Sequence, residues 1–325
     1  MRIAIAQIPP VFLDRDATIA RVAAAVDEAG AKGCTLVAFG EAFVPGYPIW
    51  LCRTDGARFE DPAQKAMHAA YVAQGVSIED GHLEPVVEAA CRHGITVVLG
   101  IVERPRDRGG HSLFCSRVVI GPQTGLQTEP GAGPTGGVVS VHRKLMPTYE
   151  ERLCWGVGDG AGLTVHSVGP FTMGALNCWE NWMPLARAAL YAQGVDLHVA
   201  IWPGRASNTR EITRFIAMES RSYVVSASAV LTPRDIPESV PMRERMLGDP
   251  EQPVAYDGGS CIAGPDGAWL VEPVCATEGL IIADLDHTRV LAERQTFDPA
   301  GHYSRPDVLR LTVSRQRQRA ARFEG

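Results

Sequence analysis

Short, continuously apolar segments alternate with segments of helical periodicity through most of this 325-residue chain. The helical pattern is clearest where Ile19, Val22, Ala23 and Val26 recur at the spacing of one helix face. Apolar runs without polar alternation are typical of strands that are covered on both faces of a sheet. The sequence therefore predicts an α/β fold in which helices cover a sheet. The expected strands span 2–8, 35–39, 95–102, 116–121, 138–143, 163–167, 172–177, 195–202, 223–230, 260–264, 269–272 and 279–285.

The second half of the chain adds hairpin signals to this pattern. Residues 264–267 read Gly-Pro-Asp-Gly between two expected strands, so we expect a mixed sheet rather than a purely parallel one. A helix in this half is expected to begin with Asn208 and Glu211 as a capping box. No internal repeat or low-complexity linker divides the chain. We therefore expect a single domain over 1–290 and a C-terminal extension over 291–325.

Composition narrows the possible classes of function. With 46% hydrophobic and 21% charged residues, the chain can bury a large core and is not disordered. A net charge of -6 argues against nucleic acid or an acidic membrane surface as a partner. No apolar run reaches the roughly 18 residues of a membrane span, and the N-terminal segment matches a strand rather than a signal peptide, which predicts a cytoplasmic protein. We interpret the basic cluster in the tail as a solvated end; it contains Arg315, Arg317, Arg319 and Arg322.

The sequence gives no reason to expect a bound metal or cofactor. Residues 131–136 match the pattern GxGxxG, but no strand precedes them and an expected strand follows. A hairpin loop therefore explains them better than a dinucleotide site does. The eight cysteines contain no CxxC pair, so we expect free thiols in a reducing compartment. No ligand pairs occur at zinc spacing, and we assign neither a metal nor a cofactor.

Three of the expected strands end in a residue that can carry chemistry. Glu41 follows one apolar run, Lys144 follows a second, and Cys178 follows a third. In α/β sheets the functional crevice lies beyond the carboxyl ends of the strands. We therefore expect these three side chains to converge, although they are far apart in the sequence.

For each of these residues, the local sequence supports a functional interpretation, and a structural interpretation is the alternative. Cys178 stands on a strand-to-helix turn, which would expose the thiol and favour its thiolate, whereas a buried structural cysteine is the alternative. Partial desolvation of Glu41 would raise its pKa toward that of a general base, although a loop or cap carboxylate is slightly favoured when Glu41 is considered on its own. Only three of the 31 lysines and arginines are lysines, which favours a required ammonium at Lys144 over a chance exposed lysine. Glu151 or its neighbour Glu150 would orient that lysine, and periodicity does not separate the two.

Together these segments resemble the nitrilase superfamily of carbon–nitrogen hydrolases, and within it the nitrilase branch. The resemblance covers nearly the whole chain and implies an α-β-β-α sandwich of two mixed sheets flanked by helices. It also implies homo-oligomers, from dimers to spirals, with the extension over 291–325 at subunit contacts. One departure is Ala161, where nitrilases commonly carry serine; we expect it to affect loop packing more than chemistry. The matching motifs are Gly40-Glu41-Ala42-Phe43 with Pro45-Gly46-Tyr47-Pro48, His142-Arg143-Lys144-Leu145 with Pro147-Thr148, Glu151-Arg152 and Trp155-Gly156, Asn177-Cys178-Trp179-Glu180-Asn181, and Gly301-His302-Tyr303-Ser304-Arg305-Pro306-Asp307.

The resemblance assigns roles to four residues. It makes Glu41 the general base, Lys144 the cation for the tetrahedral species and Cys178 the nucleophile, and it aligns the additional family glutamate with Glu151. The implied reaction converts an organic nitrile and water into a carboxylic acid and ammonia through a cysteine thioimidate and thioester. Aromatic residues near the strand ends predict a pocket for aromatic or arylaliphatic nitriles, although core or interface packing explains each of them equally. These residues are Tyr47, Trp50, Trp155, Trp179 and Trp202.

Two kinds of alternative remain open. An amidase or carbamoyl-amide hydrolase would use the same residues, and a cyanide hydratase or dihydratase is a narrower variant. The other kind is a nucleotide-binding or assembly protein without catalysis. Only the pattern over 131–136 supports it.

Overall fold

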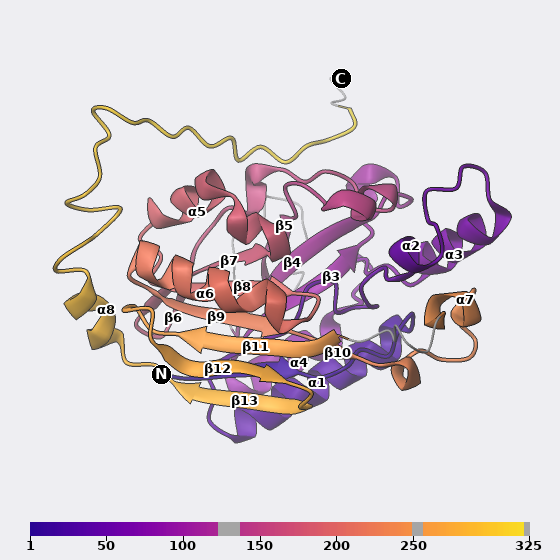
Figure 1. Ribbon diagram of the computed structural model, residues 1–325, viewed down its shortest axis with the longest axis horizontal. Helices are drawn as coiled ribbons and strands as arrows, with labels where there is room; N and C mark the ends of the chain where they lie inside the picture. The colour runs from indigo at the N-terminus through magenta and orange to yellow at the C-terminus, as the bar shows by residue number, and fades with distance from the viewer. Residues whose placement is uncertain (123–136, 249–255, 322–325) are drawn as a thin grey trace.

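Two mixed β-sheets, packed face to face, form the centre of the molecule (Figure 1). The computed structural model describes residues 1–122, 137–248 and 256–321. The first sheet contains β1 (Arg2–Gln7), β2 (Leu36–Ala38), β3 (Thr96–Glu103), β4 (Phe114–Ile120), β5 (Val138–Arg143) and β13 (Gly279–Asp284), in the order β13-β1-β2-β3-β4-β5. The second sheet contains β6 (His166–Val168), β7 (Phe171–Asn177), β8 (Leu197–Trp202), β9 (Tyr223–Ser228), β10 (Val230–Leu231), β11 (Tyr256–Ala263) and β12 (Trp269–Cys275). Its order is β10-β11-β9-β8-β7-β6, and β12 pairs with β11.

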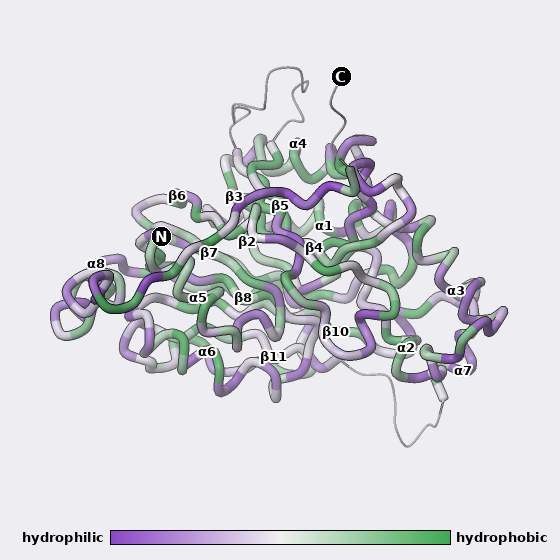
Figure 2. Tube along the Cα trace, turned by 90° about the horizontal axis from the view of Figure 1, so that it is seen from above, coloured by the Kyte–Doolittle hydropathy of each residue, from purple (hydrophilic) through white to green (hydrophobic). Residues whose placement is uncertain are grey.

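Helices cover the outer face of each sheet, as expected for strands that are apolar on both sides. Those of the chain are α1 (Arg15–Ala31), α2 (Trp50–Arg53), α3 (Pro62–Ala73), α4 (Glu84–His93), α5 (Pro184–Tyr191), α6 (Ala206–Ser220), α7 (Arg243–Leu247) and α8 (His287–Glu293). The first sheet packs against α1 and α4, and the second against α5 and α6. The α-β-β-α sandwich is therefore confirmed. Figure 2 shows the hydrophobic residues concentrated in the central strands.

The core between the two sheets combines residues of both. Ile3 and Ile5 of β1 pack in one cluster with Phe171 and Met173 of β7, and all four are buried. Each fully buried apolar side chain contributes about 1.5–3 kcal/mol to the free energy of unfolding, so this layer fixes the two sheets relative to each other. The parallel pairs β1–β2–β3 and β7–β8–β9 consequently deliver their carboxyl ends to one region.

The strand predictions agree well with the structure, and the hairpin over 264–267 is confirmed by the antiparallel pairing of β11 with β12. The capping box at Asn208 is wrong. Helix α6 begins two residues earlier, and the Asn208 side chain donates instead to the carbonyl oxygen of Gly204, at 2.9 Å. The pattern over 131–136 lies outside the described residues. No helix in the described part of the chain is long and apolar enough to cross a bilayer.

The C-terminal tail returns to the body of the protein after α8 (Figure 1). Arg317 forms an ion pair with Asp159 at 3.1 Å and donates to the carbonyl oxygen of Val141 at 2.8 Å. The neighbouring Gln318 N–H donates to the same carboxylate, at 2.9 Å. The interpretation of the basic tail as a solvated end is therefore wrong for Arg317, because a buried carboxylate nearly 160 positions away holds it.

Candidate active site

The three chemistry-bearing strand ends meet between the sheets. Glu41 lies three residues after β2, Lys144 directly after β5, and Cys178 directly after β7. The Lys144 Nζ atom is 2.8 Å from Glu41 Oε1 and 2.7 Å from Glu151 Oε2. Cys178 is close enough for its thiol and these charged groups to shift one another's pKa. We refer to these four residues as the candidate cluster.

Glu41 is held in place by its backbone. Its N–H donates to the carbonyl oxygen of Trp202 at the end of β8, at 3.0 Å, so its backbone links the loop after β2 to the second sheet. Burial raises the pKa of Glu41 to about 7, with Lys144 opposing the rise and Glu151 adding to it. The expected shift toward a general base is thus present in the structure, and desolvation is its main cause.

Both backbone polar groups of Lys144 are held by hydrogen bonds. Its N–H donates to the carbonyl oxygen of Cys115 in β4, at 2.8 Å, and its carbonyl oxygen accepts from Gly158, at 2.9 Å. A Cβ atom at Gly158 would lie 2.4 Å from that same oxygen, so only glycine permits this approach. Burial lowers the pKa of Lys144, but Glu41 and the neighbouring thiols and carboxylate raise it more, and the side chain stays an ammonium.

Glu151 rather than Glu150 belongs to the cluster. Its carboxylate accepts from the Thr148 N–H at 2.6 Å and from the Tyr47 hydroxyl at 2.7 Å, in addition to Lys144. Thr148 and Glu151 form a capping box around one turn of 3₁₀ helix, which turns this carboxylate inward. Glu150 remains half-buried outside the cluster.

Cys178 begins a 3₁₀ turn over Cys178–Trp182 and has φ of 44°, a left-handed conformation that is uncommon for a residue with a side chain. Such strain is often stored at functional sites. The thiol is buried, so the predicted exposure is wrong. Burial also raises the pKa of Cys178 well above its ordinary range, although Lys144 and the Trp179 N–H oppose the rise. The predicted preference for thiolate is therefore wrong too, and this thiol needs a base.

The predicted pocket aromatics occupy different places. Tyr47 and Trp155 border the candidate cluster: their ring centroids are 5.7 Å apart, and Lys144 Nζ lies 5.8 Å from the Trp155 ring. Trp202 is buried beside Cys178 in one hydrophobic cluster. Trp50 is buried edge-on to Tyr71, at 4.5 Å, and the Trp179 ring is half exposed beside Trp182.

Sequence reasoning missed two residues beside the cluster. The Cys115 thiol adjoins the Glu41 carboxylate, and burial raises its pKa well above the ordinary range. Tyr256 packs edge-on to Tyr47, at 5.9 Å between ring centroids. Cys115 lies just outside the strand expected at 116–121, and Tyr256 is more than 200 positions from Tyr47. The strand boundary contained a weak signal for Cys115, whereas nothing local pointed to Tyr256.

Known proteins resemble this chain in sequence and in fold. The model of the family described as Carbon-nitrogen hydrolase matches residues 2–295. The chain belongs to the carbon–nitrogen hydrolase family. It is 35% identical over 321 residues to an aliphatic nitrilase of Sinorhizobium fredii, covering 97% of this chain and 96% of that one. It is 32% identical over 344 residues to an arylacetonitrilase of Macrophomina phaseolina, covering 98% and 92%.

Solved structures give the same fold at lower identity. An amidase of Nesterenkonia sp. AN1, with acrylamide added to its active-site cysteine, superposes with a TM-score of 0.62 at 19% identity, covering 91% of this chain and 97% of that one. A nitrilase-superfamily protein of Saccharomyces cerevisiae superposes with a TM-score of 0.65 at 15% identity, covering 93% and 96%. The chain is thus a hydrolase that acts on carbon–nitrogen bonds, with the sandwich fold of its superfamily.

One buried carboxylate links the loops that carry Lys144 and Cys178. Glu180 accepts from the N–H of Leu145 at 2.5 Å, from the N–H of Asn177 at 2.8 Å and from His142 Nε2 at 3.1 Å. Leu145 directly follows Lys144, and Asn177 directly precedes Cys178. Burial raises the pKa of Glu180, but His142 and the two N–H groups lower it further, so the group stays ionised.

Glu180→Gln is therefore expected to destabilise the hydrolase by about 3 kcal/mol, because it removes one partner of a buried charged network. Chemical denaturation followed by tryptophan fluorescence measures the change in the free energy of unfolding. Asp284→Asn is the control, since it removes an exposed ion pair with Arg2 that solvent screens and that contributes little to stability. Equal effects of the two variants would contradict the role given to Glu180.

The pKa of Glu41 predicts how the hydrolase depends on pH. Below about 7 the carboxyl is protonated and cannot accept a proton from the thiol. We expect kcat/KM to fall about tenfold per pH unit below 7 and to level off above it. A profile measured with an uncharged substrate tests this. An inflection near the ordinary carboxyl pKa of 4.5 would show that Glu41 is not the titrating group.

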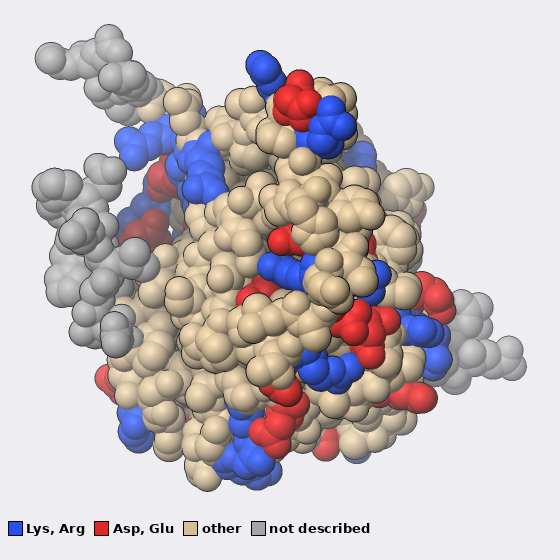
Figure 3. Space-filling model, turned by 90° about the vertical axis from the view of Figure 1, so that its left-hand side faces the viewer, with Lys and Arg blue, Asp and Glu red and all other residues tan. Residues whose placement is uncertain are grey.

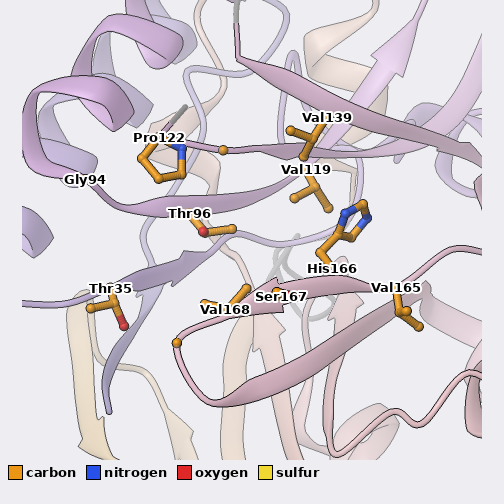
Figure 4. A pocket seen from close by; sticks show the side chains of 12 residues that line it. Thr35, Gly94, Thr96, Val119, Pro122, Val139, Val165, His166, Ser167 and Val168 are labelled. Carbon is orange, nitrogen blue, oxygen red and sulfur yellow. The ribbon is translucent and has the colours of Figure 1, made fainter. Parts of the chain in front are cut away.

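A separate pocket lies at the opposite ends of the strands (Figure 4). It has a volume of about 550 Å³, and Thr35, Thr96, Val119, Val139 and His166 are among its lining residues. Thr35 and Thr96 lie at the starts of β2 and β3, whereas Glu41 follows the end of β2. This pocket is therefore not part of the candidate cluster.

The following features concern the surface charge, possible metal ligands and the state of the cysteines in the described residues. Figure 3 shows basic and acidic side chains in mixed clusters on one face, without a continuous basic surface. Within the described ranges, no three His, Cys, Asp or Glu side chains are arranged to hold a metal ion. All eight cysteines are free, five of them buried, as the sequence predicts.

Proposed function

We propose that this hydrolase is a nitrilase, which converts an organic nitrile and two waters into a carboxylic acid and ammonia. The observation that carries the proposal is the buried ammonium of Lys144 between Glu41 and Glu151, beside the Cys178 thiol. The curated relatives that cover nearly the whole chain are named nitrilases, which supports the same reaction.

In the proposed mechanism, Cys178 Sγ attacks the nitrile carbon while Glu41 accepts the thiol proton. A soft sulfur nucleophile suits the weakly electrophilic nitrile carbon. Proton transfer to the nitrile nitrogen gives a covalent thioimidate. Water then adds to the thioimidate carbon with Glu41 as base, and Lys144 stabilises the tetrahedral species.

Breakdown of that species completes the first half of the reaction. The C–N bond breaks and ammonia leaves with two protons, the one that Glu41 had taken up from water and the hydroxyl proton of the tetrahedral species, so that a thioester remains on Cys178. A second water, deprotonated by Glu41, attacks the thioester carbon. The C–S bond then breaks, the carboxylic acid leaves and the thiol regains its proton. Glu151 keeps Lys144 and Tyr47 in position through both halves.

We further propose aromatic or arylaliphatic nitriles as substrates. Tyr47 and Trp155, which pack edge-on against each other beside the cluster, support this preference because they offer apolar ring surface next to the reacting atoms. The named relatives include both an aliphatic nitrilase and an arylacetonitrilase, so the preference depends on this chain's own residues.

Ammonia release from a panel of nitriles tests the function. The panel contains benzonitrile, phenylacetonitrile, butyronitrile, cyanide and the amides that correspond to the three organic nitriles. We expect acid and ammonia from the aryl nitriles, with mass spectrometry detecting a covalent adduct on Cys178. Amide cleavage without nitrile cleavage would establish an amidase instead, and turnover of cyanide alone would establish a cyanide-hydrating enzyme.

We also propose a homo-oligomer. Large apolar side chains are exposed together on the cysteine turn, α5 and α6, and a surface of this kind is typical of protein contacts. Arg187 lies over the Phe215 ring at 5.5 Å and links α5 to α6 beneath them. Light scattering coupled to size exclusion tests the mass, and Leu185→Glu should shift it toward the monomer. The exposed residues are Trp179, Trp182, Leu185, Phe215 and Met218.

The proposed oligomer also bears on how the chain is divided into a domain and an extension. We propose that 1–290 form the catalytic domain and that the extension over 291–325 makes further subunit contacts. Its exposed apolar side chains, Val308 and Leu309 among them, support this role. Cytoplasmic localisation is part of the same proposal and is tested by cell fractionation.

A further inference from the structure

A row of aromatic rings leads from the candidate cluster to the surface. Lys144 Nζ lies 5.8 Å from the Trp155 ring, whose centroid is 5.7 Å from that of Tyr47. Tyr47 is in turn 5.9 Å from Tyr256, and the guanidinium of Arg205 lies over the Tyr256 ring at 5.7 Å. The row therefore begins at a buried ammonium and ends at an exposed guanidinium.

The second sheet fixes the position of Arg205 relative to the reacting groups. Arg205 lies three residues beyond Trp202, the last residue of β8, whose carbonyl oxygen accepts from the Glu41 N–H. Strand β8 runs parallel to β7, with Ile201 opposite Asn177. The strand ends that carry Cys178 and Arg205 are thus direct neighbours.

The backbone around Arg205 is held tightly. A Cβ atom at Gly204 would lie 2.4 Å from the Cβ of Tyr256, and one at Gly259 would lie 2.4 Å from the Ala206 nitrogen. Arg205 itself has φ of 77°, a conformation that glycine adopts more readily than any residue with a side chain. A strained residue that carries a long cationic side chain is a candidate for function.

Within the described residues, the guanidinium of Arg205 contacts the Tyr256 ring but no carboxylate. Among residues 1–122, 137–248 and 256–321, no carboxylate lies within ion-pair distance of its guanidinium. Other arginines near the site are paired: Arg143, for example, contacts both Glu103 and Asp107. A planar guanidinium with free N–H groups is suited to bind a carboxylate through two parallel hydrogen bonds.

We propose that Arg205 determines specificity by binding a carboxylate on the substrate, at the end remote from the cyano group. The substrate class is then a cyanocarboxylate whose aryl or alkyl spacer lies along the aromatic row. This inference rests on the proposed nitrilase function and narrows it.

The test compares mononitriles of dicarboxylic acids with their methyl esters. The pairs are para-cyanobenzoate, and the adipate and pimelate mononitriles, each measured beside its ester. For wild type, Arg205→Gln and Arg205→Lys, the readout is the ratio of kcat/KM for acid to kcat/KM for ester. We expect Arg205→Gln to lower this ratio about tenfold or more, as loss of a charge-assisted hydrogen bond does, and Arg205→Lys to retain part of it.

Arg210→Gln is the matched control, because Arg210 is an exposed arginine in α6, the helix that begins directly after Arg205. It removes the same charge five residues further along the chain without removing the guanidinium over Tyr256. We expect its acid-to-ester ratio to equal that of wild type. Equal ratios in wild type and Arg205→Gln, or equal losses in Arg205→Gln and Arg210→Gln, overturn the inference.

A binding measurement separates this inference from the proposed function. Calorimetric titration of Cys178→Ala with adipate mononitrile and with its methyl ester requires no turnover. In one outcome, wild type hydrolyses no nitrile, yet adding Arg205→Gln to Cys178→Ala selectively weakens binding of the acid. The nitrilase proposal then fails and the carboxylate site stands. If nitriles are hydrolysed and neither readout depends on Arg205, the carboxylate site fails and the nitrilase stands. Absence of both turnover and binding overturns both.

Discussion

Replacing Cys178 by alanine is expected to lower kcat by about 10⁴-fold or more, because no covalent intermediate can form without the sulfur. The thiol is buried beside Glu41 and Lys144 at the end of β7. Ammonia release from the best nitrile of the panel measures the loss. Circular dichroism and the unfolding midpoint check that the variant is folded.

Cys91→Ala is the control for this prediction, since Cys91 is an exposed thiol on α4. It should retain wild-type turnover and wild-type labelling by an electrophile in the active site. If Cys178→Ala releases ammonia at more than a few per cent of the wild-type rate, sulfur is not the nucleophile. Cys115 would then be the next thiol to replace, because it also adjoins Glu41.

Lys144→Arg is expected to lower kcat by about 10³-fold, although it keeps the positive charge. The ammonium fits between Glu41 Oε1 at 2.8 Å and Glu151 Oε2 at 2.7 Å, and its side chain has no exposed surface. A guanidinium is larger and planar, so it would displace one carboxylate and move the charge away from the tetrahedral species. Single-turnover measurements of ammonia release separate this chemical defect from slow product release.

Lys32→Arg is the matched control for the lysine. Lys32 is exposed and pairs with Glu28 at 2.6 Å, where a guanidinium is easily accommodated. We expect wild-type kcat from it. Turnover by Lys144→Arg within a few fold of wild type would mean that a diffuse positive charge is sufficient and that the geometry of the ammonium is unimportant.

The parts of the fold that could be predicted are those set by local pattern. The strand expected at 138–143 has those same bounds in the structure because its apolar run ends at a charged pair, Arg143 and Lys144. The meeting of Glu41, Lys144 and Cys178 could be predicted because strand ends in such sheets face one crevice. These expectations needed only the order of residues along each segment.

The parts that could not be predicted depend on contacts between distant segments. The protonation of Cys178 was misjudged because the local turn favours thiolate, whereas burial between two sheets outweighs it. Arg317 was predicted to be solvated, as part of the basic tail, because its partner, Asp159, is remote in the sequence. Arg205 follows β8 and contacts the ring of Tyr256 at the start of β11, and no periodicity within either segment marks that pair.

The ion pair between Arg317 and Asp159 has a consequence for the order in which the chain folds during synthesis. Asp159 belongs to the loop whose Gly158 lies against the backbone of Lys144, so the last described stretch of the chain contacts the loop that supports Lys144. On the ribosome, Asp159 lacks its contacts with Arg317 and Gln318 until these residues have been translated and have left the exit tunnel. We therefore expect the nascent enzyme to acquire its native lysine loop late, well after both sheets have formed.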